Sequence, residues 1–158
     1  IEKPLLRLDT DEENIPSRAL MLLGAYSVGL GEGARDMAVE YAKVREQFGK
    51  PIGSFQAIKH LCADMAIRSE AALCQASFAS LVMADASPDS DFHAVASKIV
   101  ATDVAVKNAA ANIQVHGAFG FTSEANAHHY LKRSHVVDML WGSLREQRER
   151  ILTFPTPA

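Results

Sequence analysis

Apolar side chains recur with the period of an α-helix between residues 16 and 48. Two interleaved sets, each with a spacing of seven residues, form this pattern: Leu23, Leu30, Met37 and Val44, and Ser27, Ala34 and Tyr41. The spacing predicts a long helix with one buried stripe. Gly49 and Pro51 come directly after this segment and predict that the helix ends near residue 48.

Two further segments show the same period. The first begins at Ser54, a predicted N-cap, runs to about residue 84, and has a stripe made of Ile58, Leu61, Cys62, Met65, Ser69, Ala72, Leu73 and Ala76. The second runs from about residue 91 to 116, and Gly117 is predicted to end it. Beyond the loop at 117–122, Ser123 is predicted to cap a short helix over 124–133, and a last helix is predicted over 138–152.

The residue types along these segments favour helices throughout. The sequence has 25 alanines against 11 aromatic residues, and alanine both favours the helix and lets helices approach closely. We therefore predict an all-α fold, an up-and-down four-helix-type bundle with one or two extra short helices. The predicted organisation is an N-terminal extension or linker over 1–15, one domain over 16–152 and a frayed tail over 153–158.

Charge and hydropathy exclude several classes of partner. The 16 basic and 19 acidic residues give 16 − 19 = −3, and no basic face is concentrated enough to predict binding to nucleic acid or to a membrane surface. No apolar run approaches a membrane span and no signal-peptide core is present, so we expect a cytoplasmic protein. Cys62 and Cys74 lie about 18 Å apart along one predicted helix, too far for a disulfide, which predicts two buried thiols.

Neither a metal site nor a nucleotide loop is predicted. Four histidines cluster late in the chain, but no acidic or cysteine partner stands at ligand spacing, and a Glu-x-x-His motif is absent. A phosphate-binding loop requires a preceding strand, and no strand is predicted before the run of glycines from Gly29 to Gly33. Close helix packing is therefore the preferred interpretation of these glycines.

The segment from Tyr41 to Gln56 suggests an anion site. Arg45 stands in the last turn of one predicted helix, and Ser54 and Gln56 stand at the start of the next. A fixed cation beside a helix N-terminus suits a phosphate group. By composition alone, the segment also fits an ordinary junction between two helices.

This segment resembles a signature of the acyl-CoA dehydrogenase family, R-x-x-F-G-x-x-I-x-x-F-Q, which begins here at Arg45. Three more matches follow in the family's order, at residues 63–66, at residues 114–121, and at Gly142 and Ser143 with Gln147. The resemblance extends from about residue 19 to residue 152. It identifies the chain as similar to the carboxy-terminal helical domain of that family.

The resemblance implies a flavoprotein that dehydrogenates an acyl-CoA thioester in fatty acyl or sterol side-chain β-oxidation. It also implies FAD held across the subunit interface of a dimer or tetramer, and an electron-transferring flavoprotein as partner. Carried over by position, the implied FAD contacts are Arg45 and Gln47 at the pyrophosphate, Phe48 and Gln56 nearby, Gln114 and Gly117 at the adenosine part, and Ser143 and Gln147 from a T-S-x-I-Q-like motif. Ala118 departs from the family's pattern, where a glycine is usual.

The family's catalytic base is missing from its expected positions. Relatives remove the α-proton with a glutamate, but Trp141 occupies its usual place and Ala19 its alternative place. Three accounts stay open: a cofactor-binding but non-catalytic partner of a related subunit, as in some steroid-degrading actinobacterial relatives; another carboxylate such as Asp138 or Glu146; or a scaffold that has lost the chemistry. A non-enzymatic oligomerisation module is the competing class.

The length of the chain adds a further expectation. Family enzymes carry an amino-terminal helical domain and a β-domain before this one, and the 158 residues hold neither. We expect the isolated domain to be inactive and the chain to be an excerpt of a larger protein or one part of an assembly.

Overall fold

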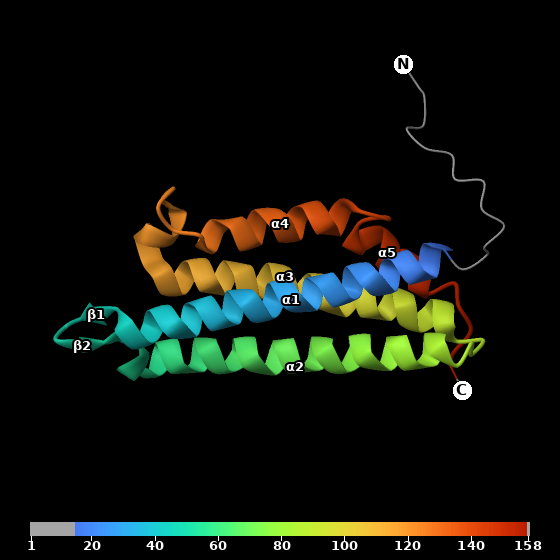
Figure 1. Cartoon of the computed structure of the whole chain (residues 1–158), viewed down its shortest axis with the longest axis horizontal. Coiled ribbons are helices and arrows are strands. Elements are labelled where there is room, and N and C mark those ends of the chain that lie inside the picture. The colour runs from blue at the N-terminus through green and yellow to red at the C-terminus, as the bar shows by residue number, and fades with distance from the viewer. Residues whose placement is uncertain (1–14, 158) are drawn as a thin grey trace, which may run out of the picture.

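The computed structural model describes residues 15–157. Three long helices lie side by side along the longest axis of the molecule, and two shorter helices pack at one side of them (Figure 1). Their bounds are α1 (Ile15–Val44), α2 (Gln56–Ala84), α3 (Ser90–His116), α4 (Ala127–Met139) and α5 (Leu144–Ile151). The predicted all-α bundle is confirmed.

Three short elements connect the helices. A hairpin of two-residue strands, β1 (Glu46–Gln47) and β2 (Lys50–Pro51), follows α1 and leads into the 3-10 turn η1 (Ile52–Ser54). A second 3-10 turn, η2 (Gly117–Phe121), follows α3. These connections place the hairpin and η2 at the same end of the bundle (Figure 1).

Small residues form the buried face of α1. Its buried positions are Ser17, Leu20, Gly24, Ser27, Val28, Gly31, Ala34, Ala38 and Ala42. Ser27 and Ala34 are buried as predicted, but Val44 is 74% exposed, and the large residues of the predicted stripe lie at its edge. The prediction placed the stripe too far round the helix because it followed the large side chains, whereas the contact with α3 selects small ones.

The glycines of α1 allow this close packing. A Cβ added at Gly24 would collide with Ser97 of α3, and one at Gly31 would lie 3.3 Å from Val104 Cγ1. A Cβ at Gly33 would lie 2.8 Å from the ring of Tyr130 on α4. Close helix packing therefore explains these three glycines, while Gly29 faces open space.

Two predicted serine caps were wrong and one helix was misplaced. Ser54 lies in η1 and donates to the carbonyl of Pro51 (2.7 Å), so that Phe55 precedes α2 instead. Asn126, and not Ser123, precedes α4. The helix predicted over 124–133 is α4, which extends to Met139, and the helix predicted over 138–152 is confined to α5 (Leu144–Ile151). The two helices are separate because Trp141 (φ +56°) and Gly142 (φ +93°) adopt a left-handed backbone that no α-helix continues through.

The domain bounds predicted from the sequence stay predictions. Residues 1–14, most of the predicted N-terminal extension, lie outside the described residues, and α1 already includes Ile15. Phe154, in the predicted tail, packs at the edge of the cluster formed by Leu20, Ala94 and Val95.

The described part of the chain contains no helix that is long and apolar enough to span a membrane. The predicted burial of both thiols was wrong for Cys74, which is exposed, whereas Cys62 is half-buried. Cys74 lies on the outer face of α2, which the sequence pattern did not separate from the inner face because both carry apolar residues.

Candidate functional site

A tight hairpin turns the chain back at the end of α1. Phe48 (φ +56°) and Gly49 (φ +78°) form its two-residue turn, and both have the left-handed backbone that such turns require. Gln47 pairs with Lys50, and the N–H of Ile52 donates to the carbonyl of Arg45 (2.8 Å). The hairpin thus holds the backbone of Arg45 and Gln47 at the end of the bundle.

A pocket of about 290 Å³ lies between this hairpin and the end of α3. Its lining comes from α1, the hairpin, η1, α3 and η2, and comprises Tyr41, Arg45, Gln47, Ile52, Val115, His116, Gly117, Ala118 and Phe119. Three of the predicted FAD-contacting residues, Arg45, Gln47 and Gly117, meet here. We call this the hairpin pocket.

Stacked rings form part of the wall of the hairpin pocket. Tyr41 stacks on His116 with 4.0 Å between ring centroids and 21° between ring planes, and Phe119 lies parallel to Tyr41 at 6.3 Å. His116 Nδ1 lies 2.9 Å from the carbonyl oxygen of Asn112, which can only accept, so Nδ1 carries the proton. The pocket therefore combines flat apolar surfaces with the cation of Arg45.

Two glycines of η2 have different physical roles. Gly117 adopts φ +63° and ψ −144°, a conformation open in practice only to glycine, although a Cβ there would meet nothing within 4 Å. Gly120 is required by space, because its Cβ would lie 2.9 Å from the Ile113 carbonyl oxygen. Ala118 is exposed at the pocket, so the methyl group that departs from the family pattern is accommodated.

Three other predicted residues lie near this end but do not line the hairpin pocket. Phe48 is 92% exposed at the tip of the hairpin, where its ring meets Phe55 edge-on at 6.0 Å. Gln56 is the first residue of α2, and Gln114 is exposed on the last turn of α3. Among the described side chains none caps α2, and the N–H groups of Ile58 and Lys59 both donate to the carbonyl of Phe55 (3.1 Å), so those of Gln56 and Ala57 remain available to an anion.

Ser143 and Gln147 lie at α5, far from the hairpin pocket. Ser143 caps α5 in a reciprocal arrangement with Glu146, and buried Gln147 donates to the carbonyl of Trp141 (2.6 Å). Lys98 of α3 donates to the carbonyl of Gly142, next to Ser143. Lys98 precedes Gly117 by nineteen residues, which places the two groups about 28 Å apart along α3. A single chain does not bring all eight predicted residues together.

The two carboxylates considered as alternative bases both serve as helix caps. Asp138 accepts from the N–H of Leu144 (2.7 Å), and Glu146 accepts from the backbone N–H of Ser143 (2.6 Å) and from its hydroxyl. The bonds from the backbone and then the hydroxyl of Ser143 lower the pKa of Glu146. A lower pKa makes Glu146 a weaker base. Trp141 is 52% exposed and Ala19 half-buried.

The sequence analysis missed Lys98, a buried lysine whose contacts hold the segment around Trp141. One signal was available: Lys98 stands among the apolar positions of the helix predicted over 91–116, three residues after Val95 and one before Ile99. A charged residue on such a face needs internal hydrogen-bond partners.

No three His, Cys, Asp or Glu side chains of residues 15–157 come together as a metal site would require.

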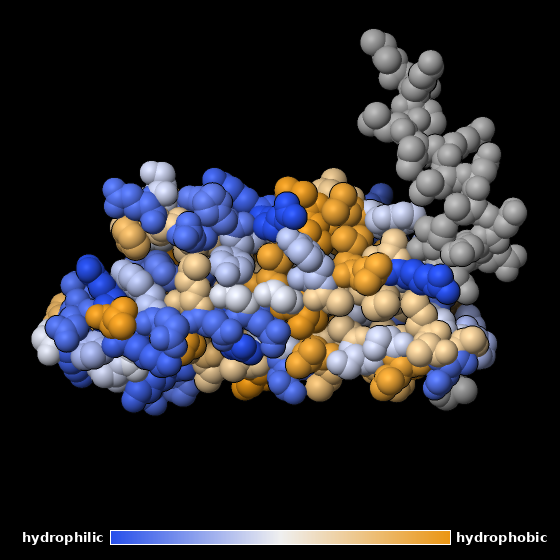
Figure 2. Space-filling model, viewed as in Figure 1, coloured by the Kyte–Doolittle hydropathy of each residue, from blue (hydrophilic) through white to orange (hydrophobic). Residues whose placement is uncertain are grey.

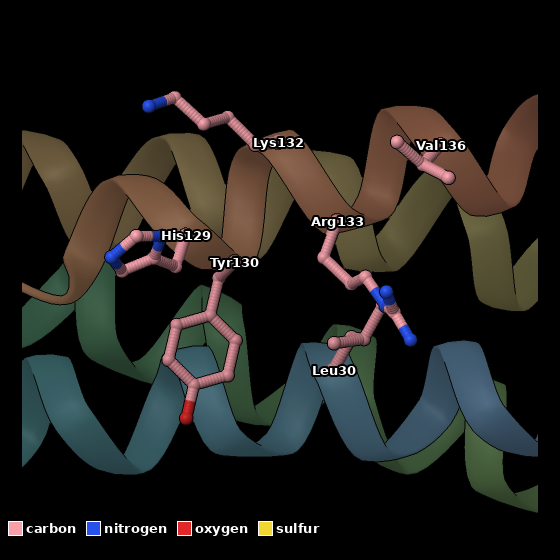
Figure 3. A pocket seen from close by; sticks show the side chains of 6 residues that line it. All are labelled: Leu30, His129, Tyr130, Lys132, Arg133 and Val136. Carbon is pink, nitrogen blue, oxygen red and sulfur yellow. The ribbon is translucent and has the colours of Figure 1, made fainter.

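A second concave surface lies between α1 and α4. This shallow groove of about 430 Å³ is lined by Leu30, His129, Tyr130, Lys132, Arg133 and Val136. Figure 3 shows Tyr130 and Arg133 pointing from α4 toward α1, whereas Lys132 points away. Arg133 Nε donates to the hydroxyl of Tyr26 (2.8 Å), which ties the groove to α1. It contains none of the predicted site residues.

Apolar side chains also gather on the surface beside this groove. In Figure 2 apolar residues cover the half of α4 that leads to α5 and the adjoining part of α1, while the hairpin end is mostly hydrophilic. Apart from Val44 at the hairpin end of α1, the exposed large apolar residues of these elements and of the following loop are Leu22, Tyr26, Val136, Met139, Leu140 and Trp141. Exposed apolar surface of this kind marks a contact with a ligand or another protein surface.

Comparisons with known proteins agree in the family that they indicate. A family model described as acyl-CoA dehydrogenase, C-terminal domain, matches residues 17–154. The chain is 44% identical over 139 residues to the acyl-CoA dehydrogenase FadE34 of Mycobacterium tuberculosis, a match that covers 85% of this chain and 19% of that protein.

Solved structures show the same fold. A chain in a structure of the electron transferring flavoprotein of Acidaminococcus fermentans has a TM-score of 0.83 and 30% identity, covering 89% of this chain and 37% of that one. A chain of the ChsE4-ChsE5 complex from Mycobacterium tuberculosis has a TM-score of 0.80 and 26% identity, covering 89% and 39%. The present chain spans between 19% and 39% of the length of these relatives.

Proposed function

Because the chain belongs to the acyl-CoA dehydrogenase family and matches its C-terminal domain, we propose that it takes part in the FAD-dependent α,β-dehydrogenation of an acyl-CoA thioester. The observation that carries this proposal is the hairpin pocket, where Arg45, Gln47 and Gly117 meet. Arg45 and the N-terminus of α2 supply positive charge at this end. These groups fit the pyrophosphate of FAD. Gly117 has no side chain, so the adenosine part of FAD can approach its backbone.

The separation of the predicted contacts supports a site shared between subunits. Arg45, Gln47 and Gly117 lie at one end of α3, whereas Ser143 follows Gly142, whose carbonyl accepts from Lys98 about 28 Å back along that helix, and Gln147 belongs to the same α5. We propose that Arg45 and Gln47, with Phe48 and Gln56 beside them, hold one FAD molecule together with Gln114 and Gly117. Ser143 and Gln147 would then contact a second FAD, held mainly by the partner subunit. One solved relative is a complex of two named chains, which agrees with such an assembly.

The chemistry requires a base that this chain does not offer at the expected place. FAD, when bound, supplies the acceptor for the hydride that leaves Cβ. The α-proton must go to a carboxylate, but Trp141 and Ala19 cannot accept it, and Asp138 and Glu146 are engaged as helix caps. We therefore propose that a homologous partner subunit supplies the glutamate and that this chain contributes to the cofactor site. An electron-transferring flavoprotein is the proposed acceptor of the electrons.

A non-catalytic assembly module is the second candidate function. The observation that favours it is Trp141, a bulky side chain at the position of the family's base. The two candidates share the bundle and its contacts with other subunits, but they differ in whether FAD is retained.

Flavin retention tests the proposal. The polypeptide that contains this chain is purified with a co-encoded homologue, and its flavin absorbance and the rise in melting temperature on adding FAD are measured. We expect bound flavin, and we expect Arg45→Ala to weaken its retention by about 1.5–3 kcal/mol. Lys107→Ala, which removes an exposed cation of α3 paired with Asp103, is the matched control. Absence of both flavin signals in the parent would leave the assembly module as the function.

A further inference from the structure

Lys98 is buried in the bundle and its ammonium group has three acceptors. Its side chain is 1% exposed, and Nζ donates to the carbonyl oxygens of Asp138 (3.1 Å), Leu140 and Gly142. An ammonium group has three N–H donors, so these three bonds satisfy all of them. All three acceptors lie at the end of α4 or in the α4–α5 loop, which we define as residues 140–143.

The α4–α5 loop is fixed from its other side by α5. The carbonyl of Trp141 accepts from Gln147 Nε2 (2.6 Å), and the N–H of Ser143 donates to Glu146 Oε2 (2.6 Å). Lys98 and the α5 side chains therefore bond different backbone groups of the same four residues. The end of α4 adds to this, because its C-terminal carbonyl groups favour a cation.

This backbone holds Trp141 in an unusual conformation. Its φ of +56° lies in the left-handed region, which bulky residues rarely adopt, and the indole ring is nonetheless 52% exposed. The ring's own packing in the bundle does not account for the conformation, because half of its surface is free. Backbone strain of this kind persists only where surrounding contacts impose it, and it concentrates at functional sites.

We infer that Lys98 is a positioning residue for Trp141: its ammonium group fixes the α4–α5 loop and presents the indole ring at one defined place on the surface. Trp141 adjoins the exposed apolar residues Met139 and Leu140. A contact between this ring and an apolar or aromatic ligand rests on the proposed function. The role of Lys98 in ordering the ring is independent of the proposed function.

The only tryptophan of the chain is Trp141, so tryptophan fluorescence of the 158-residue chain reports on this loop alone. In Lys98→Met, which keeps an unbranched side chain one heavy atom shorter and removes its donors, we expect lower indole anisotropy and stronger quenching by acrylamide, with an unchanged far-ultraviolet circular dichroism spectrum. Lys107→Met, at an exposed position of the same helix, should match the parent. A folded Lys98→Met variant with the parent's anisotropy and quenching overturns the inference.

A measurement on the unmutated chain covers the case in which Lys98→Met does not fold. A buried ammonium group bonded to three carbonyls exchanges its protons slowly, so a nitrogen-15 NMR spectrum should resolve a protected lysine NH₃⁺ signal with contacts to protons of residues 140–143. Absence of any protected lysine ammonium overturns the inference. Quenching of Trp141 emission by added FAD or acyl-CoA is a separate readout, and its failure would count against the proposed function while leaving the role of Lys98 intact.

Discussion

Tyr41 of α1 stacks on His116 of α3, with their ring centroids 4.0 Å apart. The pair joins the ends of two helices next to the hairpin pocket. Because the stacking and the burial of the ring both stabilise the fold, we expect Tyr41→Ala to lower the free energy of unfolding by about 2 kcal/mol. Tyr41→Phe keeps the ring and should remain close to the parent. Urea denaturation measures both, and equal stability of the alanine and phenylalanine variants would contradict the structural role of the stack.

Gly117 should be intolerant of a side chain for conformational reasons alone. Its φ of +63° with ψ −144° strains any L-residue, while the space around it is open. We expect Gly117→Ala to destabilise the chain by about 1–3 kcal/mol. Thermal unfolding of the variant provides the measurement.

Gly29 supplies a matched contrast to Gly117. It lies within α1, and a Cβ there would meet nothing within 4 Å. Since alanine has the higher helix propensity, Gly29→Ala should stabilise the chain by about 0.5–1 kcal/mol. A loss of stability in Gly29→Ala would show that this position makes a contact outside the described bundle.

The sequence predicted these elements unequally well. Period and composition predicted the three long helices and the stop at Gly117, because helix-forming residues and a helix-ending glycine act locally. They misjudged the face of α1, since Gly24 and Gly31 are buried through contact with α3, a distant part of the sequence. They also missed the break at Trp141, where hydrogen bonds from Lys98 and Gln147 impose a backbone that tryptophan does not favour by itself.

The candidate site was likewise predicted in part, where its residues depend on local connections, and missed where they depend on the packing of distant helices. The resemblance assigned Arg45, Gln47 and Gly117 to one cofactor from two separate motifs, and these residues lie at one pocket because short connections at one end of the bundle bring them together. Sequence order alone did not reveal that Ser143 lies at the other end of α3. That separation depends on how α5 folds back against the start of α3, where Ile151 packs near Val95.

The two thiols should differ in reactivity. Cys74 is exposed on α2, whereas Cys62 is half-buried, and burial raises the pKa of its thiol. Because the thiolate is the reactive form, a thiol reagent such as DTNB should modify Cys74 first, and the slower reaction of Cys62 should accelerate as the pH rises. Cys74→Ser should remove the fast phase and Cys62→Ser the slow one. Loss of the fast phase in Cys62→Ser would contradict the assignment.

Glu146 should make stability depend on pH in the acid range. Hydrogen bonds from Ser143 lower its pKa in the folded chain below the model-peptide value, so the folded state binds its proton less readily than the unfolded state does. The resulting stabilisation is present above the unfolded pKa and is lost as the pH falls through the folded pKa. Glu146→Gln should therefore be less stable than the parent at neutral pH, with the difference shrinking toward low pH. Urea denaturation at several pH values tests this, and a difference that does not change with pH would contradict it.

The helix α3 fixes the distance and the angle between the two ends of the molecule. Lys98 and Gly117 belong to one uninterrupted helix and its cap, so neither end can change its distance or angle to the other without breaking that helix. Insertion of a single residue between Lys98 and Gly117 would lengthen α3 by about 1.5 Å and turn one end by about 100° relative to the other. The hairpin pocket and the α4–α5 loop would then no longer share their present alignment, even if each kept its own geometry.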